Sequence, residues 1–289
     1  MDFKTELNSR IETVNNWISE LSPKGKGLHA IIFESANYSI SAGGKRLRPL
    51  LAYSVSDMLD GEPETAMYFA SAVEFIHTYS LIHDDLPCMD NDDYRRGLPT
   101  NHKKFGEAIA LLAGDTLLTY AFEVASRSQT SPATTVKAIN AISKAAGMNG
   151  MIGGQVIDIN GASDYEQLKT VHKMKTGALI RLSCYLGAIS AECDDEKLSA
   201  IDKFADNLGI AFQIKDDILD VESTVEELGK PIGSDEKRGI ITYVSLFGTD
   251  GAKEKLKYHT NEAKSALEVF GSKADFLKNL ADYLLDRKN

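Results

Sequence analysis

Residues 66–85, AMYFASAVEFIHTYSLIHDD, decide the class of fold. Between Ala66 and His83 the only acidic or basic residue besides histidine is Glu74, and the others are apolar, aromatic or small. A helix that is apolar on every side lies inside a protein. His77 and Asp84 are seven residues apart and therefore almost in line on a helix, and such a polar stripe has to face a cavity or polar partners. This stretch predicts a central helix that carries functional groups into the interior.

Two aspartate clusters each end a strongly apolar helical stretch. The first consists of Asp84, Asp85 and Asp90, and the second of Asp216, Asp217 and Asp220. Carboxylates at the C-terminal end of a helix add to the negative end of its dipole and therefore favour a divalent cation. Mg²⁺ prefers one or two carboxylates together with phosphate oxygens and water. The clusters together predict a divided magnesium site for a diphosphate, whereas either cluster alone is equally compatible with a solvated helix end.

The spacing within the clusters predicts their local geometry. Asp206, Gln213 and Asp220 are spaced by seven residues, and Asp216 lies four before Asp220, so all four share one helical face. In the first cluster Pro87 disfavours helix at the preceding residue. The chain must therefore loop to bring Asp90 back towards Asp84.

Helical periodicity extends over almost the whole chain, and no segment alternates with period two for long enough to form a strand. The predicted helical stretches are 3–21, 28–41, 45–60, 64–84, 105–128, 132–149, 164–191, 195–220 and 250–285. These stretches, without a linker between them, predict one all-α domain over residues 1–289. Helical bundles build metal sites from side chains on facing helices.

Composition excludes other classes of function. The net charge of −10 argues against nucleic-acid binding. The three cysteines, Cys88, Cys184 and Cys193, lack metal-ligand spacing and fit a reducing compartment. The N-terminus has no signal pattern and no uncharged run reaches the length of a membrane span. We therefore expect a cytoplasmic protein that is not inserted in a membrane.

Cations cluster near the same features. Gly43-Gly44 leads into Lys45, Arg46 and Arg48. Arg95-Arg96 follow the first aspartate cluster, and Lys215 directly precedes the second. Lys175 and Lys230 stand in two further short motifs, Lys175-Thr176-Gly177 and Gly229-Lys230-Pro231. Each of these cations taken singly is more often a solvated surface charge. Arginine forks and lysine charges are nevertheless what a diphosphate without metal requires. Metal ligands and cations together predict two diphosphate sites.

These residues match a known family in order along nearly the whole chain. The matching segments are Gly43 to Pro49, Tyr79 to Gly97, Gly114-Asp115, Gly153 to Asp158, Lys175 to Leu179, Phe212 to Asp220 and Thr242-Tyr243. The chain closely resembles the short-chain trans-prenyl diphosphate synthases. Two extra residues in the first aspartate motif are similar to the bacterial-type farnesyl diphosphate synthases and to the related bacterial and plastid geranylgeranyl synthases.

The resemblance implies an all-α isoprenoid synthase fold with a central cavity, which couples an allylic diphosphate to isopentenyl diphosphate in a homodimer. It implies that Asp84, Asp90 and Asp216 ligate three Mg²⁺ ions, with Asp85, Asp217 and Asp220 as further or water-mediated partners. It assigns contacts with the allylic diphosphate to Arg95, Lys175 and Lys230, and cation stabilisation to Thr176 and Gln213. It assigns isopentenyl diphosphate binding to Lys45, Arg48, His77 and Arg96.

Product length is predicted from Tyr79 and Ser80, which lie five and four residues before Asp84. The resemblance associates a bulky aromatic at this position with C15 products, although a packed core aromatic is an equal alternative. The alternative functions are those of a geranylgeranyl synthase, of a non-catalytic subunit of a heteromeric synthase and of a terpene cyclase. The chain departs from the usual family pattern at three positions, Ser234, Ile240 and Val244.

Overall fold

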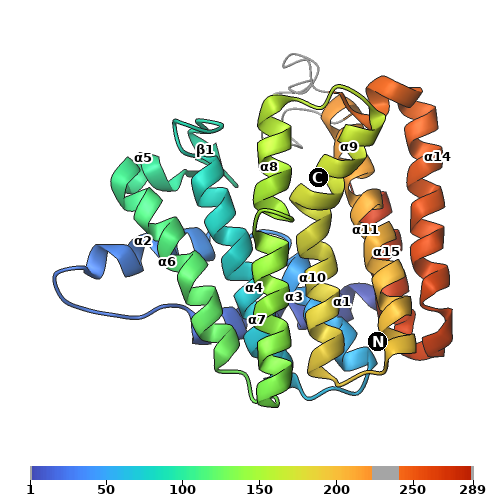
Figure 1. The fold of residues 1–289 in the computed structure, drawn as a ribbon, viewed down its shortest axis with the longest axis horizontal. Helices are drawn as coiled ribbons and strands as arrows, with labels where there is room; N and C mark the ends of the chain where they lie inside the picture. Colours follow the sequence, from blue (N-terminus) through green and yellow to red (C-terminus); the bar gives the residue numbers. More distant parts are fainter. Residues whose placement is uncertain (1, 223–240, 288–289) are drawn as a thin grey trace.

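The computed structural model describes residues 2–222 and 241–287, and these residues form a bundle of helices (Figure 1). The helices are α1 (Phe3–Leu21), α2 (Ala30–Ser41), α3 (Leu47–Met58), α4 (Pro63–Asp84), α5 (Asn101–Phe105), α6 (Glu107–Ser126), α7 (Pro132–Ala146), α8 (Met151–Asn160), α9 (Tyr165–Val171), α10 (Ala178–Ser190), α11 (Asp195–Glu222), α14 (Tyr243–Ala266) and α15 (Asp275–Asp286). A π-helical turn, η1 (His172–Gly177), joins α9 to α10, and a 3₁₀ turn, η2 (Glu268–Ala274), precedes α15. The predicted all-α class is confirmed.

Helix α4 is the central buried helix that its sequence predicts. It packs against α6, α3, α10 and α1, and Phe69, Phe75 and Ile76 are fully buried in the largest apolar cluster. Its one internal charge, Glu74, is also buried and accepts a hydrogen bond of 2.7 Å from Arg46. Burial of both charges is tolerated because each neutralises the other.

Several predicted boundaries were wrong. Helix α8 was not predicted, because the four glycines between Gly147 and Gly154 disfavour helix. The stretch 164–191 is interrupted by η1, and the stretch 250–285 begins earlier, at Tyr243, and is broken by η2, where Gly271 has φ +59°. Two very short strands, β1 (Tyr94–Arg95) and β2 (Leu98–Pro99), form an antiparallel hairpin that the periodicity did not predict.

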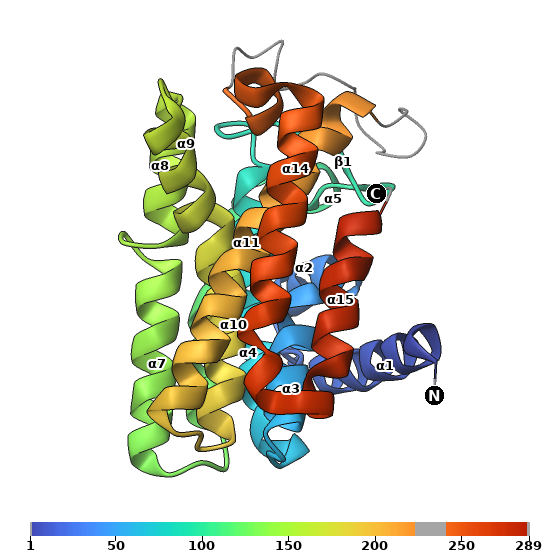
Figure 2. The same ribbon diagram turned by 90° about the vertical axis from the view of Figure 1, so that its right-hand side faces the viewer.

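The C-terminal ends of α4 and α11 lie at the same end of the bundle, beside the β1–β2 hairpin (Figures 1 and 2). Helix α15 also ends there, whereas the N-terminus of α1 lies towards the opposite end (Figure 2). The topology therefore brings both aspartate clusters, which are far apart in the sequence, to one end of the molecule.

Helix α6 is long and apolar enough to cross a membrane by length and composition. It packs against α4, α2, α5 and α7, and a core helix of a globular protein meets the same criteria. Only 39% of its most apolar window is buried within this chain, however.

Candidate active site

The first aspartate cluster forms where α4 ends. The chain turns after Asp84, and the backbone N–H of Asp90 donates to the carbonyl of Asp84 at 2.8 Å, so the loop returns Asp90 to the helix end, as the position of Pro87 predicts. Asp85 is buried and accepts a two-pronged contact from Arg95 at 2.6–2.9 Å. Arg95 therefore fixes the Asp85 carboxylate and ties the hairpin to α4.

The electrostatics of Asp84 differ from those of Asp85. Burial, with a smaller contribution from the negative charge of Asp90, raises the pKa of Asp84 to about 6, while Lys175 and Arg95 act in the opposite direction. A partly buried carboxylate with a raised pKa gains free energy when a cation binds. Asp84 is thus the acid of this cluster whose surroundings most favour a metal ion.

The second cluster ends α11. Asp216 accepts a hydrogen bond from Gln213 at 3.2 Å and forms an ion pair with Arg287 at 2.5 Å. Asp217 is buried and accepts from the backbone N–H of Tyr243 at 2.8 Å, at the start of α14. Asp220 is also buried. The members of this cluster are therefore held by three different elements, α11, α14 and the C-terminal residue of the described chain.

The donor set fits a divalent cation shared with phosphate. Within the described residues, no three acidic, histidine or cysteine side chains lie close enough to hold a metal by themselves. An all-protein cage is not what Mg²⁺ requires, because this ion takes one or two carboxylates and completes its shell with phosphate oxygens and water. Two separated carboxylate clusters at one end of the bundle therefore fit ions bridged by a diphosphate.

A tight turn precedes α3 and orients its cations. Gly43 and Gly44 have φ of +82° and +117°, and a Cβ on Gly44 would lie 2.5 Å from the guanidinium carbon of Arg96. Arg96 donates to the carbonyl of Gly43. Arg46, also left-handed with φ +48°, is buried and bonds to Glu74, Asn15 and the carbonyl of Ile40. Arg46 is therefore structural, and the glycines permit the close approach of Arg96.

Arg48 and Arg96 lie close enough to His77 for their charges to act on it. The Nε of Arg48 is buried without a hydrogen-bond partner in the described part of the chain, and burial lowers the pKa of Arg48 to about 10. Burial, followed by the charges of Arg48 and Arg96, holds the pKa of His77 well below its ordinary value. A neutral His77 near Arg48 and Arg96 can donate a hydrogen bond to an anion without adding to the repulsion between the two arginines.

Lys45 lies near the second aspartate cluster. Burial and the charge of Arg287 lower the pKa of Lys45 to about 8, whereas Asp216 acts in the opposite direction. Lys45 therefore lies close enough to the second aspartate cluster to be affected by both Asp216 and Arg287.

Lys175 and Thr176 belong to the π-helical turn η1. The Nζ of Lys175 forms an ion pair of 2.6 Å with Asp158 of α8, and its charge is also felt by Asp84. A Cβ on Gly154 would lie 2.3 Å from the backbone nitrogen of Lys175, so the backbone of α8 packs directly on η1. A π-helical turn is a frequent feature of functional sites. Lys230, the remaining predicted contact, lies outside the described residues, as do Ser234 and Ile240.

Tyr79 and Ser80 lie on α4 as expected. Tyr79 is buried in the largest apolar cluster, with its ring 5.7 Å from that of His83, and its hydroxyl has no partner in the described residues. Burial, with a smaller contribution from Asp84, raises the pKa of Tyr79 to about 12. Ser80 donates to the carbonyl of His77 at 2.9 Å. Tyr79 is thus a core aromatic that also senses the charge of the first aspartate cluster.

Sequence reasoning missed the parts played by Arg287, Asp158 and Glu74. Arg287 carries no motif of its own, and only the approach of α15 to α11 brings it to Asp216. Asp158 occurs in a segment that matches the family, but its partner Lys175 is set by the contact between α8 and η1. Glu74 could have been identified, because a single charge on an otherwise apolar helix needs a buried partner.

Comparisons with known proteins identify the family of this chain. The sequence model of the polyprenyl synthetase family matches residues 29–275. The chain is 44% identical to a farnesyl diphosphate synthase of Geobacillus stearothermophilus, over 92% of this chain and 90% of that protein. It is 43% identical to a geranylgeranyl diphosphate synthase of Cyanophora paradoxa, over 99% of this chain and 96% of that one.

A crystal structure of a Zymomonas mobilis FPP/GFPP synthase in its apo form superposes with a TM-score of 0.87 at 34% identity and covers 98% of each chain. The fold and the site define an all-α prenyltransferase. The chain belongs to the polyprenyl synthetase family of short-chain trans-prenyl synthases, whose members generally use a divalent metal.

Proposed function

We propose that this prenyl chain-elongating enzyme is a farnesyl diphosphate synthase, which condenses isopentenyl diphosphate head-to-tail with dimethylallyl and then geranyl diphosphate. The observation that carries the C15 product is Tyr79, a bulky aromatic side chain buried on α4 five residues before Asp84. A large side chain beside the growing tail limits its length. A geranylgeranyl diphosphate synthase is the second candidate, because relatives of similar identity carry both names.

We infer that the metal is Mg²⁺ and that three ions bind with the allylic substrate. Asp84, Asp90 and Asp216 would hold them directly. Asp85 and Asp217 are already bound by Arg95 and by the backbone of Tyr243, so they would act through water or by positioning, and the buried Asp220 would join them. When bound, such ions neutralise the negative charge of a departing diphosphate.

The residues of the chain perform the remaining tasks. Arg48, Arg96, Lys45 and neutral His77 hold the isopentenyl diphosphate, which fixes its double bond against the allylic carbon. The allylic C–O bond breaks, the isopentenyl double bond attacks the cation, and the departed diphosphate takes the final proton. Lys175, Arg95 and Lys230 would stabilise the leaving group, and Thr176 and Gln213 would stabilise the cation without reacting with it. Apolar walls exclude the water that would quench the cation.

The proposal includes a homodimer in the cytoplasm. Helix α6 is apolar, yet Leu111 and Leu112 are 47% and 52% exposed in a single chain. Exposed apolar surface of this kind marks a protein interface, and a second copy of α6 would cover it. The cysteines Cys88, Cys184 and Cys193 are unpaired, which supports a reducing compartment.

Product analysis tests the proposal. The enzyme is incubated with dimethylallyl and isopentenyl diphosphates and Mg²⁺, and the products are dephosphorylated and separated by chain length. A predominant C15 alcohol is expected. A predominant C20 alcohol would establish the geranylgeranyl synthase instead, and no elongated product would remove both.

A further inference from the structure

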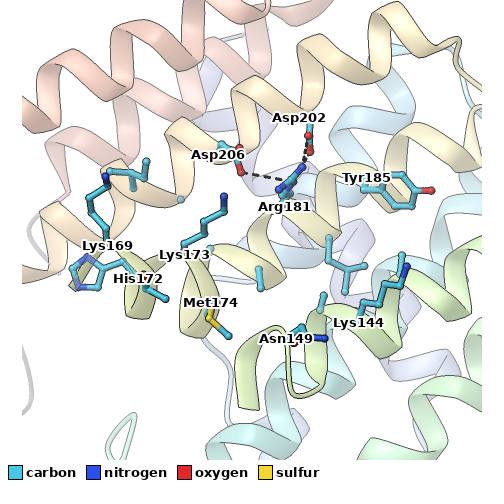
Figure 3. A pocket seen from close by; sticks show the side chains of 18 of the residues that line it. Lys144, Asn149, Lys169, His172, Lys173, Met174, Arg181, Tyr185, Asp202 and Asp206 are labelled. Atoms are coloured by element: carbon cyan, nitrogen blue, oxygen red, sulfur yellow. Dashed lines mark hydrogen bonds and ion pairs between the residues drawn. The ribbon is translucent and has the colours of Figure 1, made fainter. Parts of the chain in front are cut away.

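The π-helical turn η1 has two sides. Lys175 contacts Asp158 on the side of α8, whereas His172, Lys173 and Met174 line a cavity of about 1090 Å³ that is bounded by α7, α10 and α11 (Figure 3). Neither aspartate cluster contributes to the lining of this cavity. We name it the rear cleft; its lining residue Tyr243 donates its backbone N–H to Asp217, so the cleft borders the second aspartate cluster without including it.

The rear cleft has the size and the walls of a small-molecule site. Such sites are commonly about 300–1,000 Å³ and mostly apolar, with a few polar groups that fix orientation. Its walls include Ala141 and Ala145 of α7, Leu182 of α10 and Ile210 of α11. Tyr185 adds an aromatic surface with a hydroxyl (Figure 3). An apolar chain would be shielded from water between these helices.

The acids that line the rear cleft are mostly neutralised within the chain. Asp202 accepts two hydrogen bonds from Arg181, and Asp206 lies 3.7 Å from the same guanidinium (Figure 3). Glu166 pairs with Lys169 at 3.3 Å. Asp195 is the only lining acid without an ion-pair partner among the described residues.

The lysines of the rear cleft are less fully engaged. Lys137 and Lys144 of α7 and Lys173 of η1 are exposed and form no ion pair within residues 2–222 and 241–287. Five lining cations against four lining acids give this region a net charge of +1, while the whole chain has −10. Three unpaired lysines beside apolar walls in an acidic protein attract an anion with an apolar tail.

His172 supplies a second, independent sign of a ligand. Its side chain lines the rear cleft, is only 8% exposed and stacks on Tyr243 with ring centroids 5.6 Å apart. The Nδ1 of His172 has no hydrogen-bond partner in the described part of the chain. A buried polar atom without a partner is uncommon in a native fold, and because this nitrogen is out of reach of solvent, a ligand in the rear cleft would bond to it once the His172 ring turns.

We propose that the rear cleft binds an amphiphilic anion, a linear apolar chain that ends in a phosphate or diphosphate, with the chain between α7, α10 and α11 and the head between Lys137 and Lys144, which lie seven residues apart on α7. Prenyl diphosphates, which the family produces, and other long-chain phosphates share this chemistry. The ligand would also reach Lys173 and Met174, the two residues that precede Lys175, so its binding changes turnover by shifting η1. This site does not depend on whether the enzyme makes C15 or C20 products.

Binding is tested by calorimetry on the full chain in EDTA, where metal-dependent binding to the aspartate clusters is absent. The probes are farnesyl diphosphate, dodecyl phosphate, farnesol and inorganic diphosphate. Farnesyl diphosphate should bind once per chain, whether or not dodecyl phosphate also binds. Farnesol lacks the phosphate head and inorganic diphosphate lacks the apolar chain, so each should bind about tenfold or more weakly. Binding of both long-chain phosphates identifies a general site for such anions, and binding of farnesyl diphosphate alone identifies a site for the enzyme's own class of product.

Two variants locate the bound anion. Lys137→Glu with Lys144→Glu reverses the charge of the head region, and Ser199→Trp fills the rear cleft without changing its charge. Each should weaken farnesyl diphosphate binding in EDTA by about tenfold or more. The matched control, Lys26→Glu with Lys257→Glu, makes the same charge change at exposed positions outside the cleft and should bind normally.

The isopentenyl site is the competing location for a metal-free anion. Arg48→Ala should therefore leave farnesyl diphosphate binding in EDTA unchanged. If Arg48→Ala abolishes the binding while the rear-cleft variants retain it, the anion lies in the isopentenyl site and the proposal is overturned. Equal affinity in wild type and both rear-cleft variants would overturn it as well.

Discussion

Identical side-chain types are assigned different tasks by their contacts. Arg46 is buried against Glu74 and the carbonyl of Ile40, whereas Arg48, two residues later, has a buried Nε with no partner in the described residues. Burial raises the pKa of both Asp84 and Asp85, but Asp85 is also held by hydrogen bonds from Arg95. The side chain whose hydrogen bonds are satisfied within the fold stabilises it, and the neighbour whose bonds are not satisfied is available to a ligand.

Asp84→Asn should stabilise the metal-free protein and abolish turnover. The folded pKa of Asp84, about 6 against an ordinary 3.8, means that metal-free wild type loses stability as pH rises from about 4 to 6. Removing the charge should raise the free energy of unfolding above about pH 6 by about 1–2 kcal/mol, a figure reduced for partial exposure. Urea unfolding in EDTA at about pH 5 and about pH 8 measures the change.

The control for this prediction is Asp250→Asn, an exposed acid on α14. It should alter neither stability nor turnover. Near-normal turnover of Asp84→Asn at saturating Mg²⁺ would contradict the role of Asp84 at the metal site.

Arg48→Ala should raise the KM for isopentenyl diphosphate far more than that for the allylic substrate. A charge-assisted hydrogen bond contributes about 1.5–3 kcal/mol, so the KM should rise about tenfold to a hundredfold. Steady-state kinetics with each substrate varied in turn gives both constants. The exposed Arg127→Ala provides the control, and a change confined to the allylic KM would show that the two sites are interchanged.

At the level of elements, the contact between α8 and η1 positions Lys175. Glycine at 154 lets the backbone of α8 approach η1 closely, and Asp158 one turn later pairs with Lys175. The predicted helical stretches end at 149 and resume at 164, and the glycines at 150, 153 and 154 disfavour helix in between. The same glycines are required by the packing, which is why the local pattern and the tertiary structure disagree there.

Gly154→Ala should reduce kcat more than it reduces stability. The added Cβ would lie 2.3 Å from the backbone nitrogen of Lys175, so η1 has to move. A displacement of about 1 Å at a reacting group can cost roughly a hundredfold in rate. Turnover and thermal unfolding are measured together, with Gly251→Ala in α14 as the matched helical substitution, and an unchanged kcat would show that Lys175 tolerates the shift.

The side chain of Tyr79 on helix α4 is expected to limit the chain length of the product. Tyr79→Ala should shift the main product from C15 towards C20 or longer, because removal of a buried ring before Asp84 deepens the space available to the growing tail. Loss of a buried aromatic also costs about 3–5 kcal/mol of stability, so the assay is run well below the unfolding temperature. Tyr79→Phe, which keeps the ring, should retain C15, and an unchanged C15 product from Tyr79→Ala would assign the limit to other residues.

For the whole molecule, one end of the bundle collects the ends of α4, α11 and α15. Arg287 reaches Asp216 from the C-terminal side, and Lys45 senses both charges. No local pattern connects these three residues, which come from opposite parts of the chain. Helix α6 leaves apolar side chains, Leu111 and Leu112, exposed on the surface of a single chain.

Leu112→Glu should convert the proposed homodimer into monomers. A charge buried against apolar groups of a second copy is strongly unfavourable. Light scattering coupled to size-exclusion chromatography at micromolar concentration gives the molar mass. Val269→Glu, an exposed apolar residue of η2, should leave the mass unchanged, and a Leu112→Glu dimer would place the interface elsewhere.

The sequence alone determined the all-α class, the central position of α4 and the residues of both aspartate clusters, because hydrophobic periodicity and local charge are properties of short segments. It also carried the resemblance to the prenyl synthases, which the comparisons confirmed. Only the tertiary structure decided that Arg46 is structural while Arg48 is not, that α8 packs on η1 at Gly154, and that Arg287 pairs with Asp216. These contacts join residues that are far apart in the sequence. A local pattern of residues cannot show which distant polar groups become buried together, so the sequence did not predict them.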